Sequence, residues 1–114
     1  MIQAAAADET DVRGSAGNKV AYSALVTAIF DDSTAVADVL VEKAAIPIDD
    51  AGVTGNTPLM WSAIFCKTNV MSSLLLKGAS VTLANKDGKT PLALAKNAGC
   101  ASGAALLRRA GARK

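Results

Sequence analysis

The chain has no histidine and only two cysteines, Cys66 and Cys100. Without histidine, neither a Ser-His-Asp triad nor a Cys-His pair can form, and two cysteines cannot complete an ordinary zinc site. Aromatic residues are also scarce, at 4% of the chain, although 51% of its residues are hydrophobic. Alanine supplies much of that share, and such small side chains suit closely stacked helices. The composition therefore gives no support to an enzyme or to a bound cofactor.

Long apolar segments and a secretory leader are lacking too. The longest apolar stretch, residues 21–30, contains Ser and Thr and is half as long as a membrane span. The start has no basic region before its first acid, Asp8. We expect an intracellular protein, in the cytoplasm or inside an organelle. A targeting peptide removed from a longer precursor would also fit this start.

Acidic residues are nearly missing from the second half of the chain. Residues 1–54 hold nine acids and three bases, a formal charge of −6. Residues 55–114 hold one acid, Asp87, and nine bases, a formal charge of +8. Two interpretations stay open, namely solvated faces of opposite sign, or a dipolar module that is oriented by its partner or stacked head to tail.

One five-residue pattern occurs twice, 33 residues apart. Residues 55–59 read Gly-Asn-Thr-Pro-Leu, and residues 88–92 read Gly-Lys-Thr-Pro-Leu. The register continues, because a Leu at 74 and a Gly-Ala pair at 78–79 recur at 107 and 111–112. A fixed period of this length indicates a solenoid of stacked units. The pattern resembles the ankyrin-repeat family, whose repeat starts with Thr-Pro-Leu, contains two helices and ends in Gly-Ala.

This resemblance implies an all-α solenoid of helix-turn-helix units joined by short β-turn fingers. We divide the chain into an N-terminal tail or cap (1–18), a degenerate first repeat (19–54), a second repeat (55–87) and a C-terminal third repeat (88–114). The family usually has His after Thr-Pro-Leu, where this chain has Met60 and Ala93. That departure bears on local rigidity rather than on the fold.

The repeat predicts three pairs of helices. Pro58 suits a first helical position, where its missing N–H is not needed, and Asp31, Asp32 and Ser33 suit a turn that caps the helix after it. The expected helices cover about 21–30, 34–43, 58–65, 69–76, 91–97 and 102–109. Trp61 is expected to pack, as are the core residues Leu25, Ala28, Val36, Leu40, Leu59, Val70, Leu74, Leu75, Leu92, Leu106 and Leu107.

The two cysteines fall in nearly corresponding places of adjacent repeats, close to the turn after the first helix. Stacked helices lie about 8–10 Å apart, whereas a disulfide needs Cα atoms within about 7 Å. We therefore expect Cys66 and Cys100 to be free thiols in a reducing compartment.

Three ligand-like patterns have simpler explanations. Residues 88–90 resemble the end of a phosphate loop, but Leu83 stands where that motif needs glycine. Two Asp-Asp pairs lack the surroundings of a calcium loop and suit capping and turns. Four basic residues near the C-terminus, without interleaved aromatics, are a weak signal for nucleic acid.

The resemblance implies protein binding through the turn tips and the first helices. Ile64 and Phe65 carry the most weight, because the family usually has polar residues there. Consecutive helical residues point about 100° apart, so both cannot face one narrow core. Phe65 could instead pack on the tail or on the first repeat. By position, the candidate contact residues are Phe30, Val53, Asn56, Met60, Ile64, Phe65, Lys67, Lys86, Lys89 and Asn97.

The expected function is a non-catalytic protein-protein interaction module, acting as a scaffold or adaptor without a cofactor. The alternative is a small structural subunit permanently embedded in a larger, for example organellar, complex. High mean hydropathy, a short run of repeats and the lack of an obvious polar cap favour that alternative. Nothing in the sequence names the partner.

Overall fold

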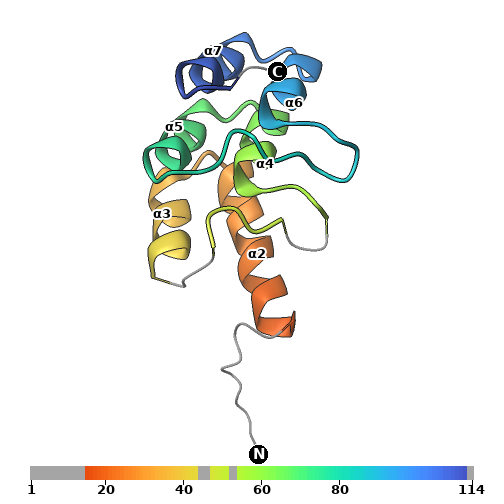
Figure 1. Ribbon diagram of the computed structural model, residues 1–114. Helices are drawn as coiled ribbons and strands as arrows, with labels where there is room; N and C mark the ends of the chain where they lie inside the picture. Colours follow the sequence, from red (N-terminus) through yellow and green to blue (C-terminus); the bar gives the residue numbers. More distant parts are fainter. Residues whose placement is uncertain (1–14, 44–46, 52–53, 113–114) are drawn as a thin grey trace, which may run out of the picture.

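The computed structural model describes residues 15–43, 47–51 and 54–112. Within these ranges the chain forms six α-helices and no strand: α2 (Ser15–Phe30), α3 (Thr34–Glu42), α4 (Pro58–Phe65), α5 (Thr68–Leu76), α6 (Pro91–Asn97) and α7 (Ala101–Arg109). Figure 1 shows two layers, with α2, α4 and α6 in one and α3, α5 and α7 in the other. Helices of one layer pack on the equivalent helix of the next pair. The expected all-α solenoid is confirmed.

The Thr-Pro-Leu pattern starts α4 and α6 in the same way. The hydroxyls of Thr57 and Thr90 accept hydrogen bonds from the amides of Met60 and Ala93, in each case at 3.3 Å. The proline that follows each threonine occupies the first helical turn. Each cap satisfies one of the amides that a helix start leaves without a partner. Both helices consequently have the bounds that the sequence predicts.

Each first helix ends in a turn that contains one left-handed residue. These residues are Asp32, Cys66 and Gly99, with φ of 55°, 57° and 71°. Glycine adopts this conformation at no steric cost and Asp tolerates it. The three residues therefore hold the same place in three successive repeats.

The core lies between the two layers and is made of leucines, alanines and short aliphatic side chains. Leu25, Leu59, Leu92 and Leu107 are fully or almost fully buried, as expected. The expectation for Val36 is wrong, because this residue is 51% exposed. Val36 lies on α3 in the first pair, and no described element covers the outer side of that pair.

α2 is longer than the sequence pattern predicts. It starts at Ser15 rather than near residue 21, so residues 15–18 belong to a helix and not to a tail. Gly17 is its one strong helix breaker, and a single glycine costs only about 1 kcal/mol relative to alanine. Within the described part of the chain, no helix combines the length and the apolar character needed to cross a membrane.

Candidate functional site

All four aromatic residues of the chain lie in one row across α2 and α4. The rings of Phe30 and Phe65 meet edge to face, with centroids 5.1 Å apart. Phe65 stacks on Trp61 at 5.5 Å, and the Trp61 indole N–H donates to the Tyr22 hydroxyl at 2.8 Å. We call these residues the aromatic row. The spacing of Trp61 and Phe65, four residues apart on one helix, is the sequence signal that could have revealed it.

One end of the aromatic row is buried and holds the loop before α4. The Tyr22 hydroxyl donates to the backbone carbonyl of Asn56 and lies 3.1 Å from the Thr54 hydroxyl. Its ring is almost fully buried. Tyr22 was not among the sequence candidates, and here it serves as a structural anchor that joins α2, the loop and Trp61.

The other end of the aromatic row is open to solvent. Phe30 is 57% exposed, and the Lys67 ammonium lies 5.3 Å from the centroid of its ring. Phe65 and Ile64 are half-buried, and Phe65 also packs against the core. The structure thus brings together Phe30, Phe65 and Lys67, an apolar surface with a cation at its edge.

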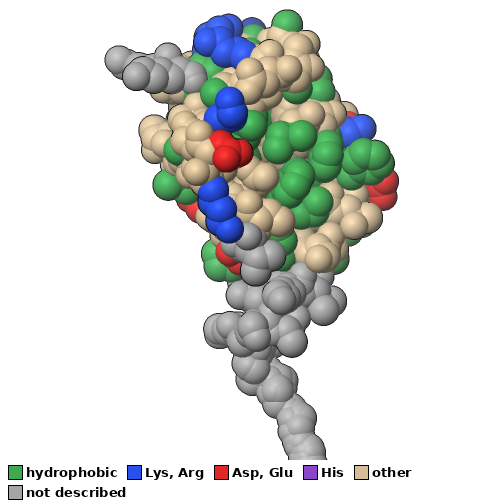
Figure 2. Space-filling model, turned by 90° about the vertical axis from the view of Figure 1, so that its right-hand side faces the viewer, with side chains coloured by type: hydrophobic (Ala, Val, Ile, Leu, Met, Phe, Trp, Pro, Cys, Tyr) green, Lys and Arg blue, Asp and Glu red, His purple; other side chains and the backbone are tan. Residues whose placement is uncertain are grey.

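Figure 2 views the molecule from the side of α2, α4 and α6. Apolar side chains gather over part of this face, a column of Lys, Arg and acidic side chains runs beside them, and further charged side chains lie at the edge. Lys86, Lys89 and Asn97 are exposed, as expected. The Lys86 side chain passes close to Gly55, at the opposite end of α4 from Phe65. Lys86, in the finger before α6, therefore does not belong to the same cluster as Phe30 and Lys67.

Two of the candidate residues, Met60 and Asn56, do not present a free side chain here. Met60 was expected to be exposed, and this is wrong because Met60 is fully buried. Its sulfur accepts a hydrogen bond from the backbone N–H of Thr57 at 3.3 Å. The buried thioether is the hydrogen-bond acceptor for the N-cap amide of α4, so Met60 is not available for contact with a partner. Asn56 is half-buried and accepts a hydrogen bond from the Asn85 side chain at 2.9 Å, which joins two fingers. Val53 lies outside the described residues.

The acids of the first repeat bond to the second repeat. Asp32 accepts from the Val70 amide at 3.2 Å and from the Asn69 side chain at 2.9 Å. Asp32 was expected to cap the helix that follows it, and it instead caps α5 of the next repeat; the Ser33 side chain makes no cap at α3. A carboxylate is well placed at a helix start, where free amides and the helix dipole favour negative charge.

The same pattern continues along α3 and beyond it. Asp38 accepts from the Ser73 hydroxyl at 2.6 Å, Glu42 pairs with Lys77, and Asp49 accepts from the Ser80 amide at 3.0 Å. The hydrogen bond from Lys77 to Glu42, with the nearby charges of Asp38 and Glu42, raises the pKa of Lys77 against a smaller lowering by burial. Several acids of the first half of the chain thus form hydrogen bonds or ion pairs with the second repeat.

Cys66 and Cys100 form a disulfide, so the expectation of two free thiols is wrong. Their Cα atoms are 5.5 Å apart. The spacing of about 8–10 Å holds between helix axes, whereas these residues are the C-cap of α4 and the N-cap of α7, where the chain leaves the axes. The argument for a reducing compartment therefore loses its support.

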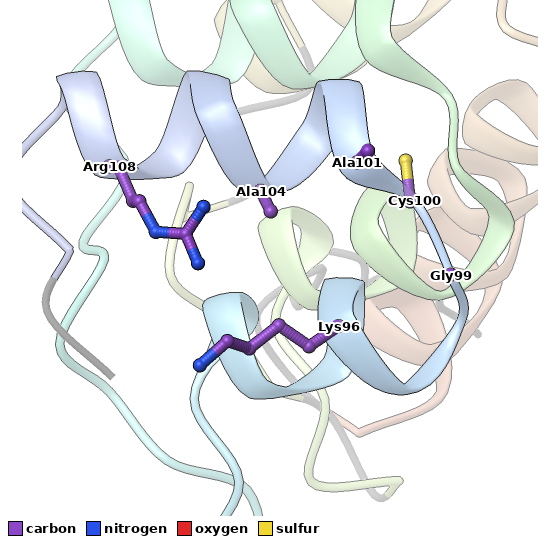
Figure 3. Close-up of a pocket in the computed structure, with 6 residues that line it drawn as sticks. All are labelled: Lys96, Gly99, Cys100, Ala101, Ala104 and Arg108. Atoms are coloured by element: carbon purple, nitrogen blue, oxygen red, sulfur yellow. The ribbon is translucent and has the colours of Figure 1, made fainter.

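Two shallow hollows involve described residues of the third repeat, and the second of them also borders the second repeat. One, of about 320 Å³, is lined by Lys96, Gly99, Cys100, Ala101, Ala104 and Arg108. Figure 3 shows the side chains of Lys96 and Arg108 converging at one end of this hollow, with Cys100 at the other. The second, of about 310 Å³, lies between α5 and α7. No group of three or more potential metal-binding side chains occurs among the residues that the structure covers.

Known proteins share this organisation. A family model described as ankyrin repeats, in three copies, matches residues 25–114. A poly [ADP-ribose] polymerase tankyrase from Caenorhabditis elegans is 46% identical over 65 residues. That match takes in 57% of this chain and 3% of the length of the tankyrase. The chain thus spans only a small fraction of the tankyrase. The polymerase activity belongs to the tankyrase, and the match does not extend it to this chain.

Proposed function

Since this chain belongs to the ankyrin-repeat family, we propose that it is a non-catalytic scaffold or adaptor that binds a partner protein through the open end of its aromatic row. Ankyrin repeats are a general protein-interaction fold. The finer assignment, including the lack of any catalytic role, is our proposal. An intracellular location remains a prediction, and free thiols no longer support it because the two cysteines are paired.

One observation carries the proposal, namely the exposure of Phe30 beside Phe65. Large apolar side chains that are exposed together mark interaction sites, and aromatic anchors dominate the energy of many interfaces. Phe30 leaves more than half of its surface in water although Phe65 lies against it. A partner would place an apolar side chain against these two rings.

Lys67 defines the chemistry at the edge of this surface. Its ammonium lies over the Phe30 ring, 5.3 Å from the centroid. A carboxylate of the partner would therefore meet a cation directly beside the apolar contact, and a basic group would meet repulsion. We expect a partner segment that combines an apolar anchor with an acidic residue.

A second candidate function is that of a subunit embedded permanently in a larger complex. A separate group of exposed apolar side chains supports it. Val36 and Val39 on α3 and Leu76 at the end of α5 are exposed, away from the aromatic row. A free adaptor would run near 11.5 kDa in size-exclusion chromatography of a gentle lysate. An embedded subunit would elute only in a large particle that resists salt.

The direct test compares two charge substitutions by quantitative affinity capture and mass spectrometry. Phe30→Glu introduces a charge at the proposed site, and Leu83→Glu introduces the same charge at an exposed apolar position that belongs to neither proposed surface. We expect Phe30→Glu to reduce capture of a specific partner at least about tenfold and Leu83→Glu to leave it within about twofold. Equal capture by both variants, with unchanged circular dichroism, would rule out this surface.

A further inference from the structure

The two cysteines of the disulfide differ strongly in their exposure to solvent. Cys66 is exposed, at the C-cap of α4. Cys100 is only 3% exposed. Thiol-disulfide exchange proceeds by attack of a thiolate on one sulfur, and access decides which sulfur is attacked. An external thiolate would therefore reach Cys66 and not Cys100.

The buried sulfur lies where a negative charge is favoured. Cys100 is the N-cap of α7, a helix of nine residues. Its Sγ lies against the first turn, since a Cβ added to Gly103 would be 2.8 Å from it. Free amides and the dipole at a helix start stabilise a thiolate. Attack at Cys66 would thus expel the Cys100 sulfur as a thiolate at the start of α7, where the helix dipole offsets part of its charge.

We propose that the Cys66–Cys100 pair is a redox-modification site, at which a small-molecule thiol of the glutathione class exchanges with the disulfide through Cys66. The thiolate attacks the Cys66 sulfur, the bond between the two protein sulfurs breaks, and Cys100 leaves as a thiolate. A second thiol then attacks the outer sulfur of the mixed disulfide and releases Cys66. Two small thiols are oxidised to one disulfide, and their protons end on the two cysteines.

The modification changes the joint between the second and third repeats. The disulfide connects the end of α4 to the start of α7, across 34 residues of sequence. Phe65 and Lys67 flank Cys66 in the chain, and Phe65 stacks on Trp61, the one tryptophan present. Opening the disulfide is therefore expected to alter Trp61 fluorescence. The fluorescence measurement does not require any partner protein.

The first experiment maps the mixed disulfide in the unaltered chain. Purified oxidised protein is mixed with reduced glutathione, quenched in acid during the reaction, and analysed by peptide mass spectrometry. We expect glutathione on Cys66 and a free thiol on Cys100 in nearly all intermediates, followed by two free thiols and a change in Trp61 emission. Glutathione found mainly on Cys100, or two cysteines left unpaired under oxidising buffer, would overturn the proposal.

Matched single variants provide a second measurement. Cys100→Ser leaves Cys66 as the sole thiol, and Cys66→Ser leaves Cys100. With glutathione disulfide, the Cys66 thiol should be modified at least about tenfold faster than the Cys100 thiol. Circular dichroism confirms that both variants are folded. Equal rates in folded variants would contradict exchange through Cys66.

Discussion

Asp32 and Cys66 hold the same position in two successive repeats, and each side chain bonds to the repeat that follows. Both have a left-handed backbone, with φ of 55° and 57°. Asp32 accepts the Val70 amide at the start of α5, and Cys66 is bonded to Cys100 at the start of α7. The turn after each of these first helices therefore holds the second helix of its neighbour, once by hydrogen bonds and once covalently.

Asp32→Ala should destabilise the first repeat. It removes the acceptor for the Val70 amide and the Asn69 side chain, at 3.2 and 2.9 Å. Loss of a helix cap typically costs about 1 kcal/mol and up to about 2. We expect a loss of that size in the free energy of unfolding, measured with urea. A value within error of the unaltered chain would show that the cap contributes nothing.

Two control variants separate the lost cap from the backbone strain. Asp32→Gly also loses the acceptor but relieves the left-handed conformation, so it should destabilise less than Asp32→Ala. Asp32→Asn keeps one side-chain oxygen and tolerates the same backbone, so it should lose the least. If alanine and glycine gave equal losses, the φ of 55° would carry no cost at this position.

The positions of α4 and α6 were predictable because local chemistry sets them. Thr57 and Thr90 cap their helices, and the prolines after them fix the first turn. These interactions span only three or four residues, so a repeated pattern determines them. The left-handed glycines that close the turns, such as Gly99, follow from the same local rule.

Two features of the structure, the burial of Met60 and the disulfide, were not predicted. Met60 was expected on the surface from its register, but its sulfur takes the place of a polar side chain at the start of α4. The disulfide was missed because a spacing between helix axes was applied to residues at helix ends. The disulfide depends on how two helix ends from different repeats meet in space, which sequence spacing alone does not specify. The Met60 contact is local, and it was missed because a thioether takes the role that a polar side chain usually has in a capping box.

Gly103→Ala tests the packing around the buried sulfur. A Cβ at this position would lie 2.8 Å from the Cys100 sulfur and 3.1 Å from the Met71 methyl carbon. Overpacking of this kind costs about 1–3 kcal/mol, against about 1 kcal/mol gained in helix propensity. We expect a net loss of about 1 kcal/mol in urea unfolding.

The control is the same change in a chain that carries Cys66→Ala and Cys100→Ala. There the sulfur is absent, so the propensity gain should dominate and Gly103→Ala should become neutral or stabilising by up to about 1 kcal/mol. An equal loss in both backgrounds would assign the effect to Met71 and not to Cys100.

Tyr22→Phe tests the buried end of the aromatic row. The change removes the acceptor of the Trp61 indole N–H and the donor to the Asn56 carbonyl. Leaving such groups without partners costs about 1–3 kcal/mol, and because Trp61 is half-buried we expect a loss near the lower end. The measurement is thermal unfolding together with Trp61 emission, which should shift as the indole loses its partner.

Thr27→Val is the matched control on the same helix. It also removes one hydroxyl, which donates to the Ser23 carbonyl at 3.0 Å on an exposed face of α2. Exposed changes of this kind are usually within about 0.5 kcal/mol. If the two variants behaved alike, Tyr22 would not be an anchor for Trp61.

Lys77 should make the stability of the chain depend on pH in the alkaline range. The hydrogen bond to Glu42 and the charges of Asp38 and Glu42 raise the pKa of Lys77 above its ordinary value of 10.5. A raised pKa means that the folded state binds the proton more tightly, so this stabilisation is complete below 10.5 and is lost as pH rises through the higher folded pKa. Subtracting the urea-unfolding free energy of Lys77→Met at each pH isolates this contribution. Because the Glu42 side chain is largely exposed to solvent, the difference should be small, constant from neutral pH to about pH 10 and smaller above it. A difference that stayed constant throughout would mean that the ion pair makes no contribution to folding.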